Sequence, residues 1–317
     1  MTANPIVLWT TLPRTICALA LALIPLYLAL YCIGRKAPVT ITTLCTATAV
    51  TSFLAIPYAF PTQCPQADII LRLGCGTAVM KALDMYARRN KPPVLNRSVS
   101  PSVYAFYLLV ELRYESFDIS TARPRPVDYN GLKEYTIHLA IFIFLQSLPQ
   151  VPVVKALGVL FAIWLIWTLM HQVLKYHNST ALFGPLYRAP NLSLFWTETW
   201  HNAYTSPTRT LGYKPVRKIF GPIGGVMGGF ALMATFHVWA FAPYLRPKGL
   251  FRVGLFFMAN GLGSVADYGV WKTNSTPLRV VVNWIFELFW AQYTVRECDI
   301  PDGILAVDFS KICRTRT

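Results

Sequence analysis

The chain has 317 residues, of which 54% are hydrophobic and only 14% are charged, whereas an average soluble domain has about 25% charged residues. Its mean hydropathy of +0.42 excludes an ordinary soluble globular protein and indicates an integral membrane protein. The formal net charge of +15 does not predict a nucleic acid partner, because the lysines and arginines lie in short loops between apolar segments, where they retain loops on the cytosolic side.

Apolar segments in chain order predict an all-α, polytopic membrane protein with about 7–8 transmembrane helices in a single domain, residues 1–317, since about 20 apolar residues cross a bilayer as a helix. The eight segments are residues 16–34, 39–58, 66–86, 135–149, 152–174, 219–245, 251–270 and 277–296. The third carries Arg72 and Lys81 and the fourth is short, so seven spans are the alternative.

The distribution of positive charge predicts a lumenal amino terminus. Loops 35–36, 87–134, 175–218 and 271–279 then face the cytosol, and they hold more than half of the lysines and arginines. We expect a multi-pass protein of the endoplasmic reticulum with the lipid bilayer as a partner; the sequence leaves the oligomeric state open.

The cysteines are odd in number and show neither a CxxC pair nor the spacing of metal ligands. Most lie within or beside apolar runs, which predicts membrane-buried packing residues and no metal site. The seven residues are Cys17, Cys32, Cys45, Cys64, Cys75, Cys298 and Cys313.

One histidine, His237, lies at the centre of the apolar stretch GGFALMATFHVWAFAPYL. Burial at bilayer depth disfavours the charged ring, and a neutral imidazole can accept a proton, as a general base must. An interhelical hydrogen bond that only holds helices together is the alternative. Gly221, Gly225 and Gly229 recur every four residues on the same segment and predict the close approach of another backbone or a flat ligand.

A second histidine, His201, follows an aromatic stripe within residues 191–218. The stripe predicts a short amphipathic helix in the membrane interface. Its members, at spacings i, i+1, i+4 and i+5, are Phe195, Trp196, Thr199, Trp200, Ala203 and Tyr204. At about 100° per residue, His201 points away from the stripe, toward a cavity or only toward water.

Four basic residues follow in the predicted cytosolic loop. They can hold the phosphates of a nucleotide-bearing donor, or they can serve the membrane orientation alone. These residues are Arg209, Lys214, Arg217 and Lys218.

The two histidine segments, FWTETWH (Phe195 to His201) and ATFHVWAFAPY (Ala234 to Tyr244), together resemble the wax-synthase branch of the membrane-bound O-acyltransferases. GTAVMKALDMYARRN (Gly76 to Asn90) adds a fainter similarity to fungal members. The resemblance implies that His237 is the catalytic base and that His201 is its partner. The short chain and the FWxxxWH form look like fungal relatives that acetylate terpenoid or meroterpenoid alcohols in secondary metabolism.

The chain departs from the plant wax synthases at two places. They carry Gly-Arg-Arg where this chain has Thr197, Glu198 and Thr199, and an acid follows their catalytic histidine where this chain has Val238. We therefore expect acetyl transfer, with long-chain wax-ester synthesis as the alternative.

The resemblance implies acyl transfer from acetyl-CoA, a cosubstrate rather than a permanently bound cofactor, to a hydroxyl of a lipophilic alcohol. His237 removes the hydroxyl proton, and His201 or Asn202 orients the acceptor or the developing oxyanion. Trp196, Trp200 and Glu287 are further candidates for substrate binding. The four basic residues are the candidates for binding acyl-CoA.

Two rival functions stay open. A small membrane terpene cyclase would use buried carboxylic acids, and Asp267 and Glu287 are the candidates. In the alternative interpretation both acids have only structural roles: Asp267 lies close to Lys272, and Glu287 forms hydrogen bonds with helix neighbours such as Asn283. A transporter or scaffold is the non-enzymatic rival, although we find no repeated halves of the kind that transporters show.

Overall fold

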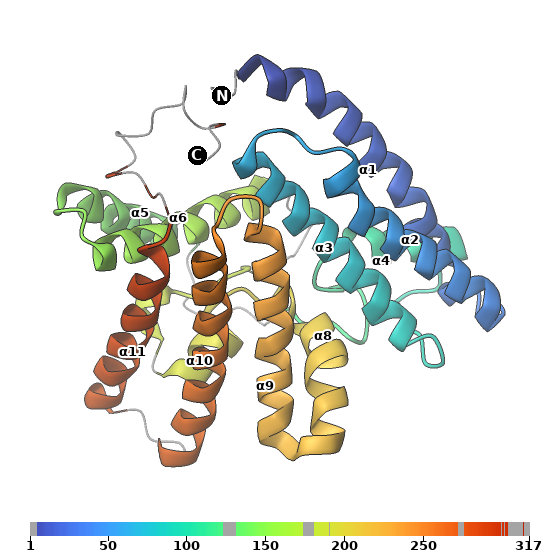
Figure 1. Ribbon diagram of the computed structural model, residues 1–317. Coiled ribbons are helices and arrows are strands. Elements are labelled where there is room, and N and C mark those ends of the chain that lie inside the picture. The colour runs from blue at the N-terminus through green and yellow to red at the C-terminus, as the bar shows by residue number, and fades with distance from the viewer. Residues whose placement is uncertain are drawn as a thin grey trace. The chain divides into compact units, whose positions relative to one another are not determined.

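The computed structural model describes residues 5–122, 131–173, 181–189, 191–271, 276–298, 300, 302–303 and 313. These residues are helical or irregular apart from a single bridge between Leu95 and Phe117, which confirms the all-α fold class. The helices are coloured in chain order in Figure 1.

The chain divides into two compact units, each built from separate stretches of sequence. Unit 1 consists of Met1–Ser120, Thr205–Leu250 and Asp308–Thr317. Unit 2 consists of Thr121–Tyr204 and Phe251–Val307. The single domain expected over residues 1–317 stays a prediction.

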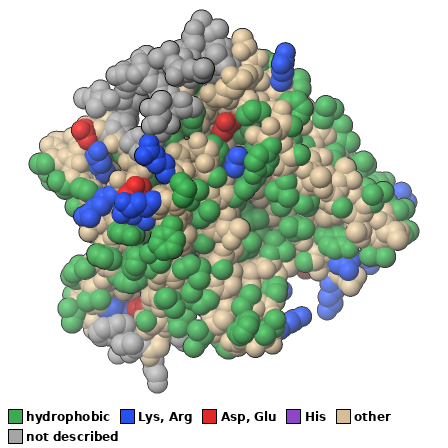
Figure 2. Space-filling model, in the orientation of Figure 1, with side chains coloured by type: hydrophobic (Ala, Val, Ile, Leu, Met, Phe, Trp, Pro, Cys, Tyr) green, Lys and Arg blue, Asp and Glu red, His purple; other side chains and the backbone are tan. Residues whose placement is uncertain are grey.

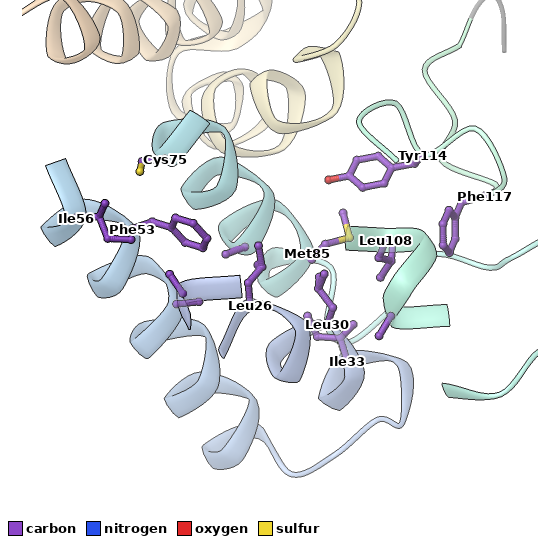
Figure 3. Packing of buried hydrophobic residues seen from close by; sticks show 14 of the residues in the cluster. Leu26, Leu30, Ile33, Phe53, Ile56, Cys75, Met85, Leu108, Tyr114 and Phe117 are labelled. Atoms are coloured by element: carbon purple, nitrogen blue, oxygen red, sulfur yellow. The ribbon is translucent and has the colours of Figure 1, made fainter. Parts of the chain in front are cut away.

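Unit 1 is built around three long helices and a shorter one. They are α1 (Pro5–Gly34), α2 (Val39–Ala59), α3 (Pro65–Ala87) and α4 (Pro101–Val110). A cluster of buried apolar side chains from all four helices forms its core, as Figure 3 shows. Leu30, Phe53, Met85 and Leu108 represent one helix each, and none is more than 2% exposed. α4 begins where the Ser100 hydroxyl accepts a hydrogen bond from the backbone N–H of Val103.

Unit 1 also contains the elements around His237. These are α8 (Thr205–Pro207), the π-helix η3 (Thr208–Tyr213) and α9 (Lys214–Phe241).

Unit 2 contains two helical pairs and several short turns. Its elements are α5 (Gly131–Ser147), α6 (Pro152–Val173), η1 (Leu186–Arg188), α7 (Leu192–Leu194), the π-helix η2 (Phe195–Thr199), most of α10 (Pro247–Trp271), and α11 (Pro277–Val295). In α5, His138 is fully buried and stacks on Trp164 at 3.7 Å between ring centroids. Its Nδ1 contacts the Glu134 carbonyl at 2.7 Å and its Nε2 accepts from the N–H of Leu186 at 3.2 Å. Both ring nitrogens are therefore engaged in hydrogen bonds within unit 2.

Five helical segments in the described part of the chain are long and apolar enough to cross a membrane. They are Trp9–Gly34, Val39–Ala59, Pro152–Val173, Thr205–Phe241 and Pro247–Asp267. Hydrophobic side chains cover much of the face in Figure 2, and many large ones are exposed, among them Leu44 at 68%, as expected of surfaces in contact with lipid.

The predicted count of 7–8 spans is not confirmed. Three of the predicted segments form the helices α3, α5 and α11 but are not among the five candidates. Charge explains α3, because Asp68, Arg72, Lys81 and Asp84 interrupt its apolar sequence. α5 has only 17 residues, and α11 carries Arg279 and Glu287.

A disulfide joins Cys64, the residue before α3, to Cys313 near the end of the chain. The prediction that all cysteines are packing residues is therefore wrong for these two. A separation of 249 residues leaves no local spacing by which sequence could find the pair. Both cysteines are lumenal in the predicted orientation, and disulfides persist in such oxidising compartments.

We expect this disulfide to be detectable in protein prepared from membranes. A thiol-reactive polyethylene glycol maleimide should add two more labels after reduction of the denatured wild-type chain, and Cys64→Ser should abolish that increment because it leaves no bond to reduce. The variant should also lose about 2–4 kcal/mol of stability. Cys17→Ser is the control; a wild-type chain that is fully labelled before reduction contradicts the expectation.

Candidate active site

The helix that carries His237 folds back on itself at Gly221. This residue has φ 71° and ψ −171°, a conformation that favours glycine because it lacks a Cβ. Pro222 then starts the second arm, since its missing N–H is tolerated in the first helical turn. η3 and the first part of α9 form one arm and residues 222–241 form the other, and Figure 1 shows the two arms side by side.

Glycines allow the two arms of this hairpin to touch. A Cβ added at Gly212 would lie 2.7 Å from the carbonyl oxygen of Gly228, and one at Gly228 would lie 2.6 Å from Cγ2 of Val216. A Cβ at Gly225 would meet the ring of Tyr213 at 2.8 Å. A closely approaching backbone is therefore found at Gly228, and it belongs to the chain's own preceding arm; a Cβ added at Gly221, by contrast, would meet nothing within 4 Å.

The hairpin corrects the prediction for the basic segment, which is a helical arm rather than a loop. Arg209 lies in η3, and the other three basic residues lie in the first turns of α9. All four side chains are exposed, so each is accessible to an anion from solution. The four residues are Arg209, Lys214, Arg217 and Lys218.

His237 lies in the second arm and is half-buried. Its Nδ1 is 2.8 Å from the carbonyl oxygen of Met233. A carbonyl oxygen only accepts hydrogen bonds, so Nδ1 carries the proton and Nε2 carries the basic lone pair. The rings of Phe236 and Phe241 lie 5.0 and 6.4 Å away between centroids. The site therefore presents one nitrogen base in aromatic surroundings.

The first arm of the hairpin extends to the helical turn before His237. The Thr208 hydroxyl donates to the sulfur of Met233 at 3.5 Å, and Met233 is the residue whose carbonyl orients the imidazole. A Cβ at Gly229 would touch the methyl group of Thr208 at 3.1 Å. The position of His237 therefore depends on how closely the two arms pack.

A buried polar cluster attaches this hairpin to α3. The fully buried carboxylate of Asp84 pairs with Arg88 at 3.0 Å and accepts from the hydroxyl of Ser206 at 2.6 Å. Arg88 also donates to Ser206 at 3.0 Å and to Thr210 at 2.7 Å. Burial, together with the nearby Asp84 carboxylate, raises the pKa of the Tyr114 phenol well above its ordinary value.

A second contact from α3 reaches the residues beside His237. Arg72 donates to the carbonyl oxygen of Trp239 at 3.1 Å and lies over the rings of Tyr58 and Trp239 at 4.8 and 5.5 Å. A Cβ at Gly76 would meet the ring of Phe236 at 2.6 Å. The resemblance over residues 76–90 implies no role for Asp84 or Arg88, although two opposite charges spaced i, i+4 in an otherwise apolar helix indicate an ion pair.

In unit 2, His201 lies among aromatic rings rather than on the predicted helix. The helical segment ends at Thr199, and Trp200 has extended dihedral angles. The ring of His201 lies 5.4 to 5.6 Å from those of Phe183, Trp200 and Tyr204. The expectation that His201 points away from the aromatic stripe is therefore wrong, because the π-helix and the turn after it change the direction of the side chain.

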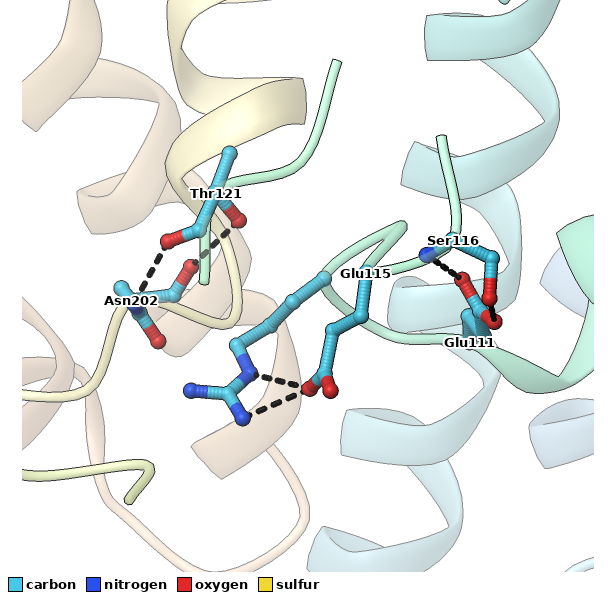
Figure 4. A network of polar contacts seen from close by, with 6 residues as sticks. Glu111, Glu115, Ser116, Thr121 and Asn202 are labelled. Atoms are coloured by element: carbon cyan, nitrogen blue, oxygen red, sulfur yellow. Dashed lines mark hydrogen bonds and ion pairs between the residues drawn. The ribbon is translucent and has the colours of Figure 1, made fainter. Parts of the chain in front are cut away.

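The amide of Asn202 is engaged by the backbone of its own unit. It donates to the Thr121 carbonyl at 2.6 Å, and the Thr121 hydroxyl donates back to the Asn202 carbonyl at 3.3 Å (Figure 4). Figure 4 also draws Glu111, which accepts from the backbone and hydroxyl of Ser116. Asn202 is 2% exposed, and its observed contact fixes the segment that follows Trp200.

The two candidate acids have different surroundings within unit 2. Asp267 forms a buried ion pair with Arg279 at 2.9 Å and accepts from the N–H of Ser193 at 3.3 Å; Lys272, its expected neighbour, lies outside the described residues. Glu287 is 8% exposed, and its Oε1 has no hydrogen-bond partner among the described residues. Within the described part of the chain the expected bond between Glu287 and Asn283 is absent, since the Asn283 amide nitrogen has no partner there either.

Residues 179–259 match the family model of the membrane bound O-acyl transferase family.

The segment that matches the membrane bound O-acyl transferase family includes both His201 and His237. It supports acyltransferase chemistry in a membrane and does not distinguish among acyl donors or acceptors. No curated protein and no solved structure matches the chain. His237 belongs to unit 1 and His201 to unit 2, so the pairing of the two histidines stays a prediction.

Proposed function

We propose that the protein is a membrane-bound O-acyltransferase that transfers an acetyl group from acetyl-CoA to a hydroxyl of a terpenoid-type alcohol at the endoplasmic reticulum. The observation that carries this proposal is His237, a half-buried imidazole with its Nδ1 on the Met233 carbonyl, within the segment matched by the acyltransferase family. That bond leaves Nε2 as a base in apolar surroundings, where a lipophilic alcohol and a thioester can react with little competition from water.

The proposed reaction is direct acyl transfer. The alcohol oxygen attacks the thioester carbonyl carbon while Nε2 of His237 takes the hydroxyl proton. The tetrahedral intermediate then collapses, the carbon–sulfur bond breaks, and the proton passes from His237 to the departing CoA sulfur. The products are an ester and free CoA, and His237 returns to its neutral form.

The acyl donor is assigned from the charge of the first arm, and the partner residue of His237 is assigned from the family resemblance. Arg209, Lys214, Arg217 and Lys218 are exposed, and their positive charge suits the phosphates of CoA. The resemblance assigns His201 to the acceptor or the oxyanion, and its aromatic neighbours are compatible with an apolar acceptor. The cyclase alternative is weakened at one of its two acids, because Asp267 is engaged in a buried ion pair with Arg279 at 2.9 Å.

An assay in microsomes tests this function. The full chain is expressed in a heterologous host, and its microsomes receive acetyl-CoA or palmitoyl-CoA with a panel of terpenoid alcohols. We expect acetyl esters and an equimolar release of free CoA, above the level of microsomes from the empty host. A preference for palmitoyl-CoA would replace acetyl transfer by long-chain ester synthesis. Isomerised alcohol without any need for acyl-CoA would replace it by cyclisation.

A further inference from the structure

Four helix ends that are far apart in sequence meet at one end of unit 1. The hydroxyls of Thr43 and Tyr86 lie 2.7 Å apart and join the start of α2 to the end of α3. The hydroxyl of Tyr27 donates to the Ser102 carbonyl at 3.3 Å, which joins the last turns of α1 to the start of α4. Figure 1 shows the turn between α1 and α2 on the same side of the unit as the end of α3. Side chains from residues 31–43 and 85–107 therefore share one surface.

This surface carries more positive than negative charge. Its cations, which we call the basic end, are Arg35, Lys36, Arg89, Lys91 and Arg97. Residues 31–43 and 85–107 contain no aspartate or glutamate. The neighbouring Asp84 is buried in its pair with Arg88, and Asp118 accepts from the backbone N–H of Val94 at 2.8 Å. The basic end therefore presents a net positive charge to any molecule that approaches it.

Each arginine of the basic end lies over the ring of a nearby tyrosine. The pairs are Arg35 with Tyr31 at 5.8 Å, Arg89 with Tyr86 at 4.2 Å and Arg97 with Tyr107 at 4.7 Å, measured from the guanidinium carbon to the ring centroid. Cation–π attraction holds each guanidinium against its ring. Each arginine also donates one hydrogen bond to its tyrosine, out of five N–H donors. A guanidinium held in this way loses less freedom when it binds the oxygens of a phosphate.

Exposed apolar side chains begin within two turns of the basic end. Val39 and Leu44 lie in the first turns of α2, and Val103 and Phe106 lie in those of α4; all four are exposed. In Figure 2, Lys and Arg side chains on this margin of the molecule lie beside hydrophobic ones. Apolar surface bordered by cations and tyrosines is typical of the boundary between hydrocarbon and headgroups. In the predicted orientation this boundary is cytosolic, and the cytosolic leaflet holds anionic lipids.

We propose that the basic end binds the phosphate groups of anionic phospholipids in the cytosolic leaflet. The phosphate oxygens accept hydrogen bonds from the arginines that are held on tyrosine rings, and the acyl chains lie along the exposed apolar surfaces of α2 and α4. Lys36 and Lys91 attract the additional negative charge of an anionic headgroup, whereas the ammonium group of phosphatidylcholine opposes a cationic surface. This surface is separate from the basic arm of the hairpin, and the inference does not depend on acyl transfer.

Spin-labelled lipids test this surface on the full chain reconstituted in phosphatidylcholine membranes. Electron paramagnetic resonance gives the association of the protein with spin-labelled phosphatidylserine relative to spin-labelled phosphatidylcholine. We expect the wild type to prefer phosphatidylserine by about fivefold at low salt, because basic residues near a membrane surface attract anionic lipid. High salt should reduce this preference by screening. The triple variant R35Q/R89Q/R97Q removes the stacked charges and should lower the preference to about twofold or less.

The double variant K36Q/K91Q changes two exposed side chains, where loss of the fold is less of a concern, and should lower the preference by about twofold. Arg14→Gln is the matched control. Arg14 is an exposed arginine of α1 at the opposite end of unit 1, where the neighbouring Thr15 hydroxyl donates to the Phe60 carbonyl at 3.0 Å. This variant should keep the wild-type preference. Melting temperatures identify a variant that has lost its fold.

Three results would overturn the proposal. The first is equal association of the wild type with both lipids, and the second is a preference that the triple and double variants retain or that Arg14→Gln loses equally. The third is displacement of spin-labelled phosphatidylserine by CoA added to the aqueous phase, which would assign the basic end to a nucleotide. Ester synthesis is not part of the measurement, so loss of the proposed function would leave the lipid result unchanged.

Discussion

His237→Ala is expected to lower the rate of acyl transfer by about 10²- to 10⁴-fold, the contribution of a positioned general base, without loss of the folded protein. The ring is half-buried, and its hydrogen bond to the Met233 carbonyl lies within a single helical turn. That carbonyl also belongs to the backbone ladder of the helix. Removing the imidazole therefore removes the base while the packing of the hairpin through its glycines is retained.

His237→Gln tests whether the imidazole acts as a base or only as a hydrogen-bonding group. Glutamine can donate and accept hydrogen bonds but cannot take up a proton near neutral pH, so it should be as inactive as alanine. His171→Ala, in α6 of unit 2, is the histidine control and should transfer at the wild-type rate. The measurement is ester formation per folded protein, with folding followed by melting temperature. Turnover within threefold of wild type in both His237 variants would remove His237 from the mechanism.

The individual helices of this fold were largely predictable from hydropathy, whereas the hairpin was not. The segments predicted over residues 16–34 and 39–58 each lie within a helix of the structure, and α6 covers the segment predicted over residues 152–174 up to Val173. Apolar composition also predicted a span over residues 219–245, but it did not reveal that the polar residues before Gly221 form a helix packed against it. That pairing depends on a positive φ at one glycine and on contacts between two arms, neither of which a hydropathy window measures.

The candidate site was predicted in its residue types more successfully than in its geometry. The spacing of Gly221, Gly225 and Gly229 identified the arm on which another segment packs, but the backbone approaches at Gly228, whereas Gly225 and Gly229 meet side chains and Gly221 meets nothing within 4 Å. The prediction of a helical aromatic stripe is wrong after Thr199 because the segment is a π-helix. In it, the N–H of Trp200 donates to the carbonyl of Phe195 at 2.6 Å. An extra residue in the turn changes the 100° step on which the helical prediction depends.

The contacts that the charged residues of α3 make could also not be predicted from the sequence. Hydropathy identified Arg72 and Lys81 as anomalies in a predicted span, and the structure gives each a definite partner. Arg72 contacts Trp239, and Lys81 donates to the carbonyl oxygens of Leu108 and Glu111 at 2.6 Å. These partners are 167, 27 and 30 residues away in sequence, so composition could identify only that a partner was needed.

Gly228→Ala should destabilise the protein by about 1–3 kcal/mol through overpacking and reduce acyl transfer with it. The new Cβ would lie 2.6 Å from Cγ2 of Val216 and 2.7 Å from the carbonyl oxygen of Gly212. Adding Val216→Ala to this variant removes the first contact, but no substitution removes the backbone oxygen of Gly212. The double variant should therefore regain only part of the lost stability. The arms are forced apart on the turns before His237, and the Thr208 to Met233 contact should lengthen as a result.

Gly74→Ala is the matched control, since nothing lies within 4 Å of its added Cβ and it also occupies a helix. Alanine is the better helix former by about 0.8–1.0 kcal/mol, so this variant should raise the melting temperature while Gly228→Ala lowers it. The opposite signs separate crowding from helix propensity. If Gly228→Ala instead matched Gly74→Ala in melting temperature and in ester formation, the two arms would not be packed through their glycines, and the position of His237 would need another support.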